Sequence, residues 1–114
     1  MAEISSQELI EMLKAGRDLE GLDLSWIDLH EIDLQGVNLR NVNLEGADLF
    51  NANLANANLA GANLYGAYLF GANLQNADLS HANLTRADLE QANLAGANLT
   101  GTVTIGANLQ GASL

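Results

Sequence analysis

The chain has no cysteine and no proline among its 114 residues, and its aromatic residues are two phenylalanines, two tyrosines and one tryptophan. Without cysteine it can form neither a disulfide nor a thiolate metal site, and a reducing compartment is compatible with it. With so few rings, its stability must come from regular packing of small and aliphatic side chains. These absences favour one small, regular domain.

Basic residues are also scarce. Four Lys and Arg stand against 14 Asp and Glu, which gives a formal net charge of −10. This charge disfavours direct binding to nucleic acid or to an anionic membrane. No run approaches the roughly 18 consecutive apolar residues of a membrane helix, and the acidic N-terminal stretch does not have the composition of a secretory signal. We therefore predict an acidic, cytoplasmic protein that does not bind membranes.

Leucine recurs every five residues from Leu19 to Leu114, with Thr104 as the exception. Relative to this central position i, position i−2 is mostly Ala, i−1 is mostly Asp or Asn, and every glycine lies at i+2. A five-residue step scatters the leucines around an α-helix, and an odd period puts successive leucines on opposite faces of a long strand. The pattern instead predicts a three-residue strand and a corner in each pentad, with positive φ at i+2.

The pentads resemble the pentapeptide-repeat family, whose pattern is A(D/N)LXX and whose members are abundant in cyanobacteria. Representative matches are ANLAN at 52–56, ADLSH at 77–81 and ANLTR at 82–86, and matching pentads fill residues 17–114. The resemblance implies an all-β solenoid, namely a right-handed quadrilateral β-helix with four pentads per coil. The 20 pentapeptides of residues 17–114 would then form about five coils.

Residues 1–16 precede the repeats and are predicted to form an N-terminal capping helix. Ser5 and Glu8 have the spacing of a capping box, and Gly16 lies where a left-handed C-cap is expected. The helix is predicted over about residues 6–15. Its apolar residues would cover the first coil, because the end of a solenoid otherwise exposes core and unpaired backbone.

One pentad, Thr102 to Gly106, departs from the repeat and has two interpretations. A one-residue slip of register would turn Val103 and Ile105 inward. Alternatively, the pentad keeps its register and Thr104 packs through its methyl group. The sequence leaves both open.

No constellation of residues in the chain predicts catalysis. His30 and His81 lie 51 residues apart on different pentad registers. Asp28, Asp48 and Asp88 share a twenty-residue register and so one face, where like charges suggest at most a weak cation site and more simply a solvated surface. We expect no enzyme activity, no cofactor and no metal site.

The aromatic residues fall on two adjacent sides of the predicted coil, and two interpretations remain open. With a neighbouring histidine they could form an exposed stripe for protein recognition. Alternatively, the rings stack on each other and merely cover the backbone. The candidate protein-interaction patch consists of Trp26, His30, Phe50, Tyr65, Tyr68 and Phe70.

We therefore expect a non-catalytic, protein-binding scaffold whose partner is not identified by the sequence. The resemblance supplies an alternative, because some acidic family members mimic duplex DNA and act on DNA gyrase; this chain could act so on gyrase or another DNA-binding protein. Residues 91–114 contain no charged side chain, so the last coil lacks the usual deterrent to edge association. A homodimer through this coil is predicted, with Leu99, Leu109 and Leu114 on the dimer face.

Overall fold

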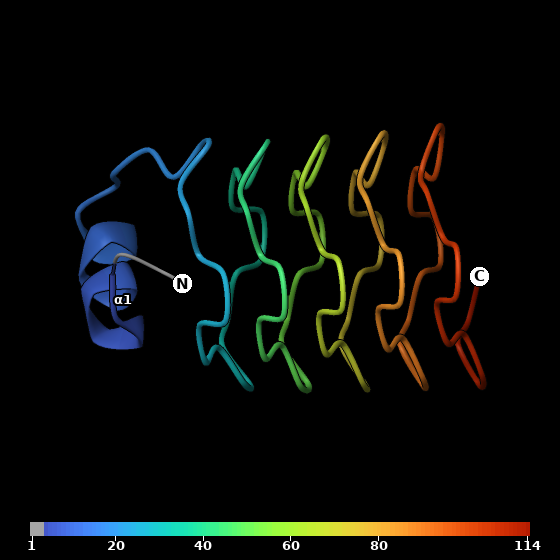
Figure 1. Cartoon of the computed structure of the whole chain (residues 1–114). Helices are drawn as coiled ribbons and strands as arrows, with labels where there is room; N and C mark the ends of the chain where they lie inside the picture. The colour runs from blue at the N-terminus through green and yellow to red at the C-terminus, as the bar shows by residue number, and fades with distance from the viewer. Residues whose placement is uncertain (1–3) are drawn as a thin grey trace.

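A computed structural model describes residues 4–114 as one helix followed by a stack of coils. Parallel bridges join residues that lie twenty apart, such as Asp23 with Asn43 and Asn43 with Asn63, so each coil contains four pentads. The coils stack side by side along one axis, and α1 (Ser6–Lys14) lies at the N-terminal end of the stack (Figure 1). The chain therefore forms an elongated solenoid measuring 34 × 24 × 23 Å.

Neighbouring coils are joined through very short bridged segments. The amide of Asn43 donates to the carbonyl of Leu22 at 2.9 Å, and the amide of Leu24 donates to the carbonyl of Asn43 at 2.7 Å. A third bond, from the amide of Trp26 to the carbonyl of Glu45 at 2.8 Å, ties the corners together. Within the described residues each bridge involves one residue, at position i−1, so the bridged segment is shorter than the predicted three-residue strand. The reason is that each corner turns the chain before a longer ladder can form.

Every corner from Gly21 to Gly111 has positive φ at i+2, as predicted. Most of these corners use Gly or Asn, but larger residues also adopt this conformation, among them Trp26 with φ 63°. A side chain at i+2 lies over the i+2 residue of the next coil, which is often glycine. For example, a Cβ added to Gly61 would lie only 2.2 Å from the side-chain amide oxygen of Asn41, so Gly61 leaves room for that side chain. The glycines therefore supply both the turn and the space for a neighbouring side chain.

The interior is filled by the leucines at i and the alanines at i−2, which are buried in every coil except the last. The outward Asn and Asp residues at i−1 stabilise the corners, because Oδ1 accepts a hydrogen bond from the amide at i+1. Asn58 and Ala60 are an example at 3.0 Å. Some also bond across coils, as when Nδ2 of Asn63 donates to Oδ1 of Asn43 at 3.2 Å. These polar side chains therefore stabilise both the corners and the stacking of neighbouring coils.

The helix predicted over about residues 6–15 is present as α1, and its C-terminal end lies one residue earlier than expected; residues 1–3 of the predicted 1–16 segment lie outside the described residues. Ser5 and Glu8 form the reciprocal capping box at the start of α1. At its end, Gly16 adopts φ 68°, and the amide of Arg17 donates to the carbonyl of Met12 at 2.9 Å in a Schellman arrangement. Leu9 is fully buried against the core of the first coil.

The irregular pentad keeps the register of the repeat. Val103 bridges to Asn83 at the ordinary twenty-residue spacing, and the hydroxyl of Thr102 donates to the carbonyl of Leu79 at 2.7 Å. Val103 and Ile105 point outward and are exposed. The register-slip interpretation is therefore wrong, because the continuous ladder of backbone bonds holds this pentad in phase with the coil before it.

Candidate functional site

One side of the solenoid differs from the other three, and we call it the third face. It consists of the outward residues at i−1 and i+1 around Leu29 and its equivalents at twenty-residue intervals. On the other sides these positions carry mostly Asn, Asp and small side chains. The third face instead carries, from the first coil to the last, Asp28, His30, Asp48, Phe50, Tyr68, Phe70, Asp88, Glu90, Asn108 and Gln110.

An aromatic stack occupies the middle of the third face. The ring centroids of Phe50 and Phe70 lie 5.9 Å apart, and those of Phe50 and Tyr68 lie 6.1 Å apart. Tyr68 and Phe70 complete the stack at 6.4 Å, and all three rings are nearly parallel. Phe50 and Phe70 therefore stack, as the second of the two interpretations of the aromatic residues predicts. Tyr68 remains 42% exposed, so the stack is open to a partner.

Tyr68 occupies position i−1, where the other pentads of the third face have Asp or Asn. At the other third-face pentads, the i−1 side chain accepts a hydrogen bond from the amide at i+1, as Asp48 does from Phe50 at 3.0 Å and Asp88 from Glu90 at 3.0 Å. Tyr68 cannot accept this bond, and within residues 4–114 the amide of Phe70 has no acceptor. The ring at position 68 is therefore present at the expense of a corner hydrogen bond.

Trp26 and Tyr65 lie outside the stack, on the second side and its corner. Trp26 is 62% exposed, and its indole ring covers Gly46 in the next coil, where a Cβ would lie 2.3 Å from the ring. Its φ of 63° is unfavourable for a bulky residue. Tyr65 is exposed. Of the predicted patch, the structure therefore brings together Phe50, Tyr68 and Phe70, and no ring pair within the described chain connects Trp26 or Tyr65 to them.

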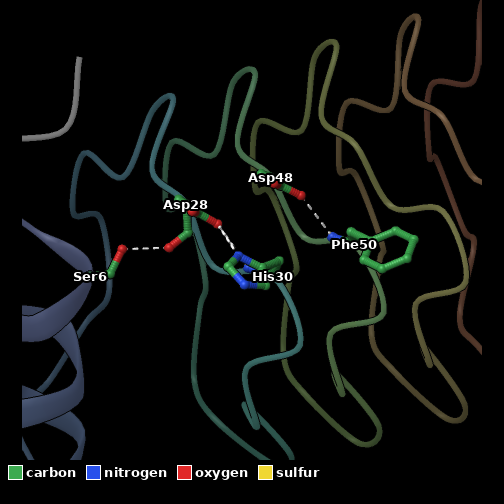
Figure 2. A network of polar contacts seen from close by, with 5 residues as sticks. All are labelled: Ser6, Asp28, His30, Asp48 and Phe50. Carbon is green, nitrogen blue, oxygen red and sulfur yellow. Dashed lines mark hydrogen bonds and ion pairs between the residues drawn. The ribbon is translucent and has the colours of Figure 1, made fainter.

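An acidic cluster with a histidine lies at the α1 end of the third face. Nδ1 of His30 donates to Oδ1 of Asp28 at 2.6 Å, and Asp48 lies beside them in the next coil (Figure 2). The ligand atoms that Asp28, His30 and Asp48 can offer are all within 4.8 Å of one another. The hydrogen bond from His30 lowers the pKa of Asp28, and the same bond, with the charges of Asp28, Asp48 and Glu31, raises the pKa of His30.

A pocket of about 270 Å³ separates this cluster from α1. Ser6, at the start of α1, donates through its hydroxyl to the backbone carbonyl of Asp28, so the helix is fastened to the coil beside the cluster (Figure 2). The pocket has a lining that is half polar and half aliphatic. It is lined by Ser6, Ile10, Asp28, Leu29, His30 and Ile32.

The twenty-residue register predicts that Asp28 and Asp48 share a face, but it does not by itself place His30 with them. The sequence signal for His30 is that positions i−1 and i+1 of one pentad both point outward on the same side of the coil. The other histidine, His81, lies over Gly101 on another part of the rod.

The predicted dimer face lies at the opposite end of the molecule. Leu99 is 40% exposed, Leu109 is 38% exposed and Leu114 is 78% exposed, whereas the equivalent leucines of the middle coils are buried. Among residues 4–114, the amides of Leu99 and Leu109 have no acceptor. These leucines and amides present both apolar and hydrogen-bonding groups.

In the part of the chain that the structure describes, no helix is long and apolar enough to cross a membrane. Residues 18–54, 47–86 and 82–114 match the family described as Pentapeptide repeats (8 copies). No curated protein matches the chain significantly.

Several solved structures resemble the chain. HetL, a pentapeptide repeat protein involved in heterocyst differentiation regulation in the cyanobacterium Nostoc sp. PCC 7120, is 43% identical, with a TM-score of 0.80 over 82% of this chain and 45% of HetL. A second Nostoc pentapeptide repeat protein is 45% identical, with a TM-score of 0.69 over 82% of this chain and 74% of that one. A pentapeptide repeat protein from the thylakoid lumen of Arabidopsis thaliana is 38% identical, with a TM-score of 0.62 over 85% and 64% of the two chains. The chain thus spans less than half the length of HetL.

Proposed function

The chain belongs to the pentapeptide-repeat family, and from that premise we propose that it is a non-catalytic scaffold that binds a partner protein through the third face. We infer further that its coils form the right-handed quadrilateral β-helix that the resemblance implies. The four corners in each twenty-residue coil support the quadrilateral section. A cytoplasmic location stays a prediction.

Tyr68 is the observation that carries the proposal. It stands where the repeat uses Asp or Asn, and it leaves the amide of Phe70 without the corner hydrogen bond. Such a bond contributes about 0.5–1.5 kcal/mol, so the fold alone favours Asn at this position. Ring stacking contributes about 0.5–1.5 kcal/mol per pair, so the two pairs that Tyr68 forms with Phe50 and Phe70 offset the lost bond with a margin of only about 1 kcal/mol. The net gain in stability is therefore small, and recognition gives the stronger reason for an exposed tyrosine here.

The chemistry of the third face favours a partner segment that carries Lys or Arg. The aromatic stack is flanked by carboxylates on both sides along the rod, Asp48 in the coil before Tyr68 and Asp88 in the coil after it. Aromatic faces attract cations, and the neighbouring carboxylates reinforce that attraction. Since the chain carries a net charge of −10, it would also steer a basic partner toward itself.

The test is a comparison of Tyr68→Asn with wild type in affinity capture from the native cell, with the same variant followed by thermal unfolding. Asn restores the corner bond, so we expect the midpoint of unfolding to change little while capture of the specific partner is lost. Thr100→Ala, on the first side of the rod, serves as the control and should capture the partner normally. Undiminished capture by Tyr68→Asn would contradict the proposed surface.

The DNA-mimic alternative is less well supported by the distribution of charge. Duplex DNA presents charge regularly along its whole length. Of the fifteen bridged pairs within residues 4–114, by contrast, only Asp28 with Asp48 places carboxylates in adjacent coils. A gyrase supercoiling assay separates the two functions. The third-face proposal expects no inhibition at micromolar protein, and salt-sensitive inhibition weakened by Asp28→Asn and Asp48→Asn would favour mimicry instead.

A further inference from the structure

The pair formed by Asp28 and Asp48 is an exception to the way in which this fold handles carboxylates. Elsewhere, an Asp at i−1 is bridged to a neutral residue in the next coil. Nδ2 of Asn43 donates to Asp23 at 3.4 Å, and Nδ2 of Asn53 donates to Asp33 at 3.4 Å. In the Asp28–Asp48 pair neither residue has a side-chain amide to donate, and the two carboxylates face each other at the spacing of one coil. A cation is therefore the missing complement of this pair.

The chain itself offers Asp28 and Asp48 one partner, which is His30. Apart from the contact of His30 with Asp28, the ion pairs among residues 4–114 are Lys14 with Glu11 and Arg40 with Glu20, and neither involves the cluster. An imidazole can act as a cation or as a metal ligand. Because His30 projects from the same face, one nitrogen donor and two oxygen donors converge on one point.

The geometry points to a binding site for a divalent cation of the zinc type, held by Asp28, His30 and Asp48. This inference does not depend on the proposed partner binding. One imidazole and two carboxylates suit zinc better than magnesium or calcium, because the latter prefer oxygen ligands throughout. Three protein ligands with an open position are a common zinc arrangement.

The distances are compatible with this ion. Tetrahedral zinc with bonds of about 2.0–2.2 Å places the ligand atoms roughly 3.4 Å apart. The three available atoms lie within 4.8 Å, so rotation of these side chains has to shorten the widest separation by about 1.4 Å.

The surroundings also fit a bound ion. A backbone amide orients each carboxylate. The amide of His30 donates to Oδ1 of Asp28 at 3.2 Å, and the amide of Phe50 donates to Oδ1 of Asp48 at 3.0 Å. The side chains are thus partly pre-positioned before any ion arrives. The pocket beside Asp28 and His30 gives room for the water molecules that would complete the coordination.

The experiment is a titration of the intact chain with Zn²⁺ in mildly alkaline buffer, so that the imidazole is free to bind. Calorimetry gives the affinity and stoichiometry, and NMR follows the ring resonances of the two histidines. We expect one ion per chain, with saturating shifts at His30 and none at His81. Asp48→Asn should weaken binding at least tenfold, and it recreates the Asp–Asn pairing that the fold uses at Asp23 and Asp33, so it should fold normally.

Asp33→Asn is the matched control, because it removes the same charge from the fourth side of the same coil as Asp28. We expect it to leave the affinity within about twofold of wild type, since loss of general attraction is screened by salt. Equal weakening by Asp33→Asn and Asp48→Asn would overturn the site and attribute binding to net charge. So would a zinc titration that leaves the His30 resonances unchanged.

Discussion

The packing of Trp26 over Gly46 gives a sharp test of the corner geometry. Gly46 and Gly66 lie at equivalent corners of successive coils, and both have φ +64°. A Cβ at Gly66 would meet nothing within 4 Å, whereas a Cβ at Gly46 would lie 2.3 Å from two atoms of the Trp26 ring. Alanine at either position therefore suffers the same backbone strain, and only at Gly46 must it also displace the indole.

The magnitudes follow from these two effects. Left-handed backbone costs an L-residue roughly 1–2 kcal/mol, which is the expected loss for Gly66→Ala. Trp26 is 62% exposed, so somewhat over a third of the ring's surface is covered. A fully buried aromatic ring removes 150–250 Å² from water, and at about 25 cal/mol per Å² the covered part contributes roughly 1–2 kcal/mol. Gly46→Ala should therefore cost about 1–2 kcal/mol more than Gly66→Ala.

The assay is denaturant unfolding of Gly46→Ala and Gly66→Ala, each with and without Trp26→Ala. Trp26 is the sole tryptophan, so its fluorescence reports displacement of the ring directly. We expect a red-shifted emission in Gly46→Ala alone, and we expect the difference between the two glycine variants to vanish when Trp26 is absent. Equal losses for both variants with unchanged fluorescence would refute the reasoning.

Three further predictions follow from the core, the histidine and the last coil. Leu59→Asp places an unpaired charge in a fully buried position and should cost at least about 3–5 kcal/mol of unfolding free energy. Thr85→Lys loses only the hydrogen bond from the Thr85 hydroxyl to Asn83 and should cost under about 1 kcal/mol. Equal losses for the two variants in thermal unfolding would contradict the assignment of position 59 to the inside and position 85 to the outside. Because Asp28 raises the pKa of His30, this contact stabilises the metal-free protein fully at pH values below the pKa of an unfolded histidine, and the stabilisation is lost as the pH rises through the raised pKa of His30 in the folded protein. An NMR titration should show a lower His30 pKa in Asp28→Asn, and an unchanged pKa would contradict the contact. Sedimentation at several concentrations should show a homodimer that Leu109→Lys disrupts, and a wild-type chain that stays monomeric at high concentration would remove the predicted dimer face.

Much of the fold could be predicted from the sequence because one short pattern determines both the inside and the corners. Leu19 and its successors, the Asn and Asp at i−1 and the residues at i+2 behave as the repeat predicts. The number of pentads in a coil could not be obtained from spacing alone and came from the resemblance. The register of Val103 stayed open because its own pentad lacks the repeat signal, and only backbone pairing with Asn83 decides it.

The candidate site was predictable only in part. The stack of Phe50 and Phe70 follows from a twenty-residue register, which can be read from the sequence once the coil is known. The position of Trp26 over Gly46 could not be read in the same way, because the direction of a corner side chain depends on a left-handed backbone that tryptophan seldom adopts. The pocket beside Asp28 also depends on how α1 docks, which the repeat does not specify.

Photo-crosslinking tests the central claim, recognition through the third face, most directly. In the native cell, a benzophenone amino acid replaces either Phe70, within the stack, or Ser80, which has the same pentad position two sides further along the coil. We predict a specific crosslinked partner from position 70 and none from position 80, and the adduct should diminish when Tyr68→Asn is added. Equal crosslinking from both positions, or a partner captured only from position 80, would contradict the third face as the interaction surface.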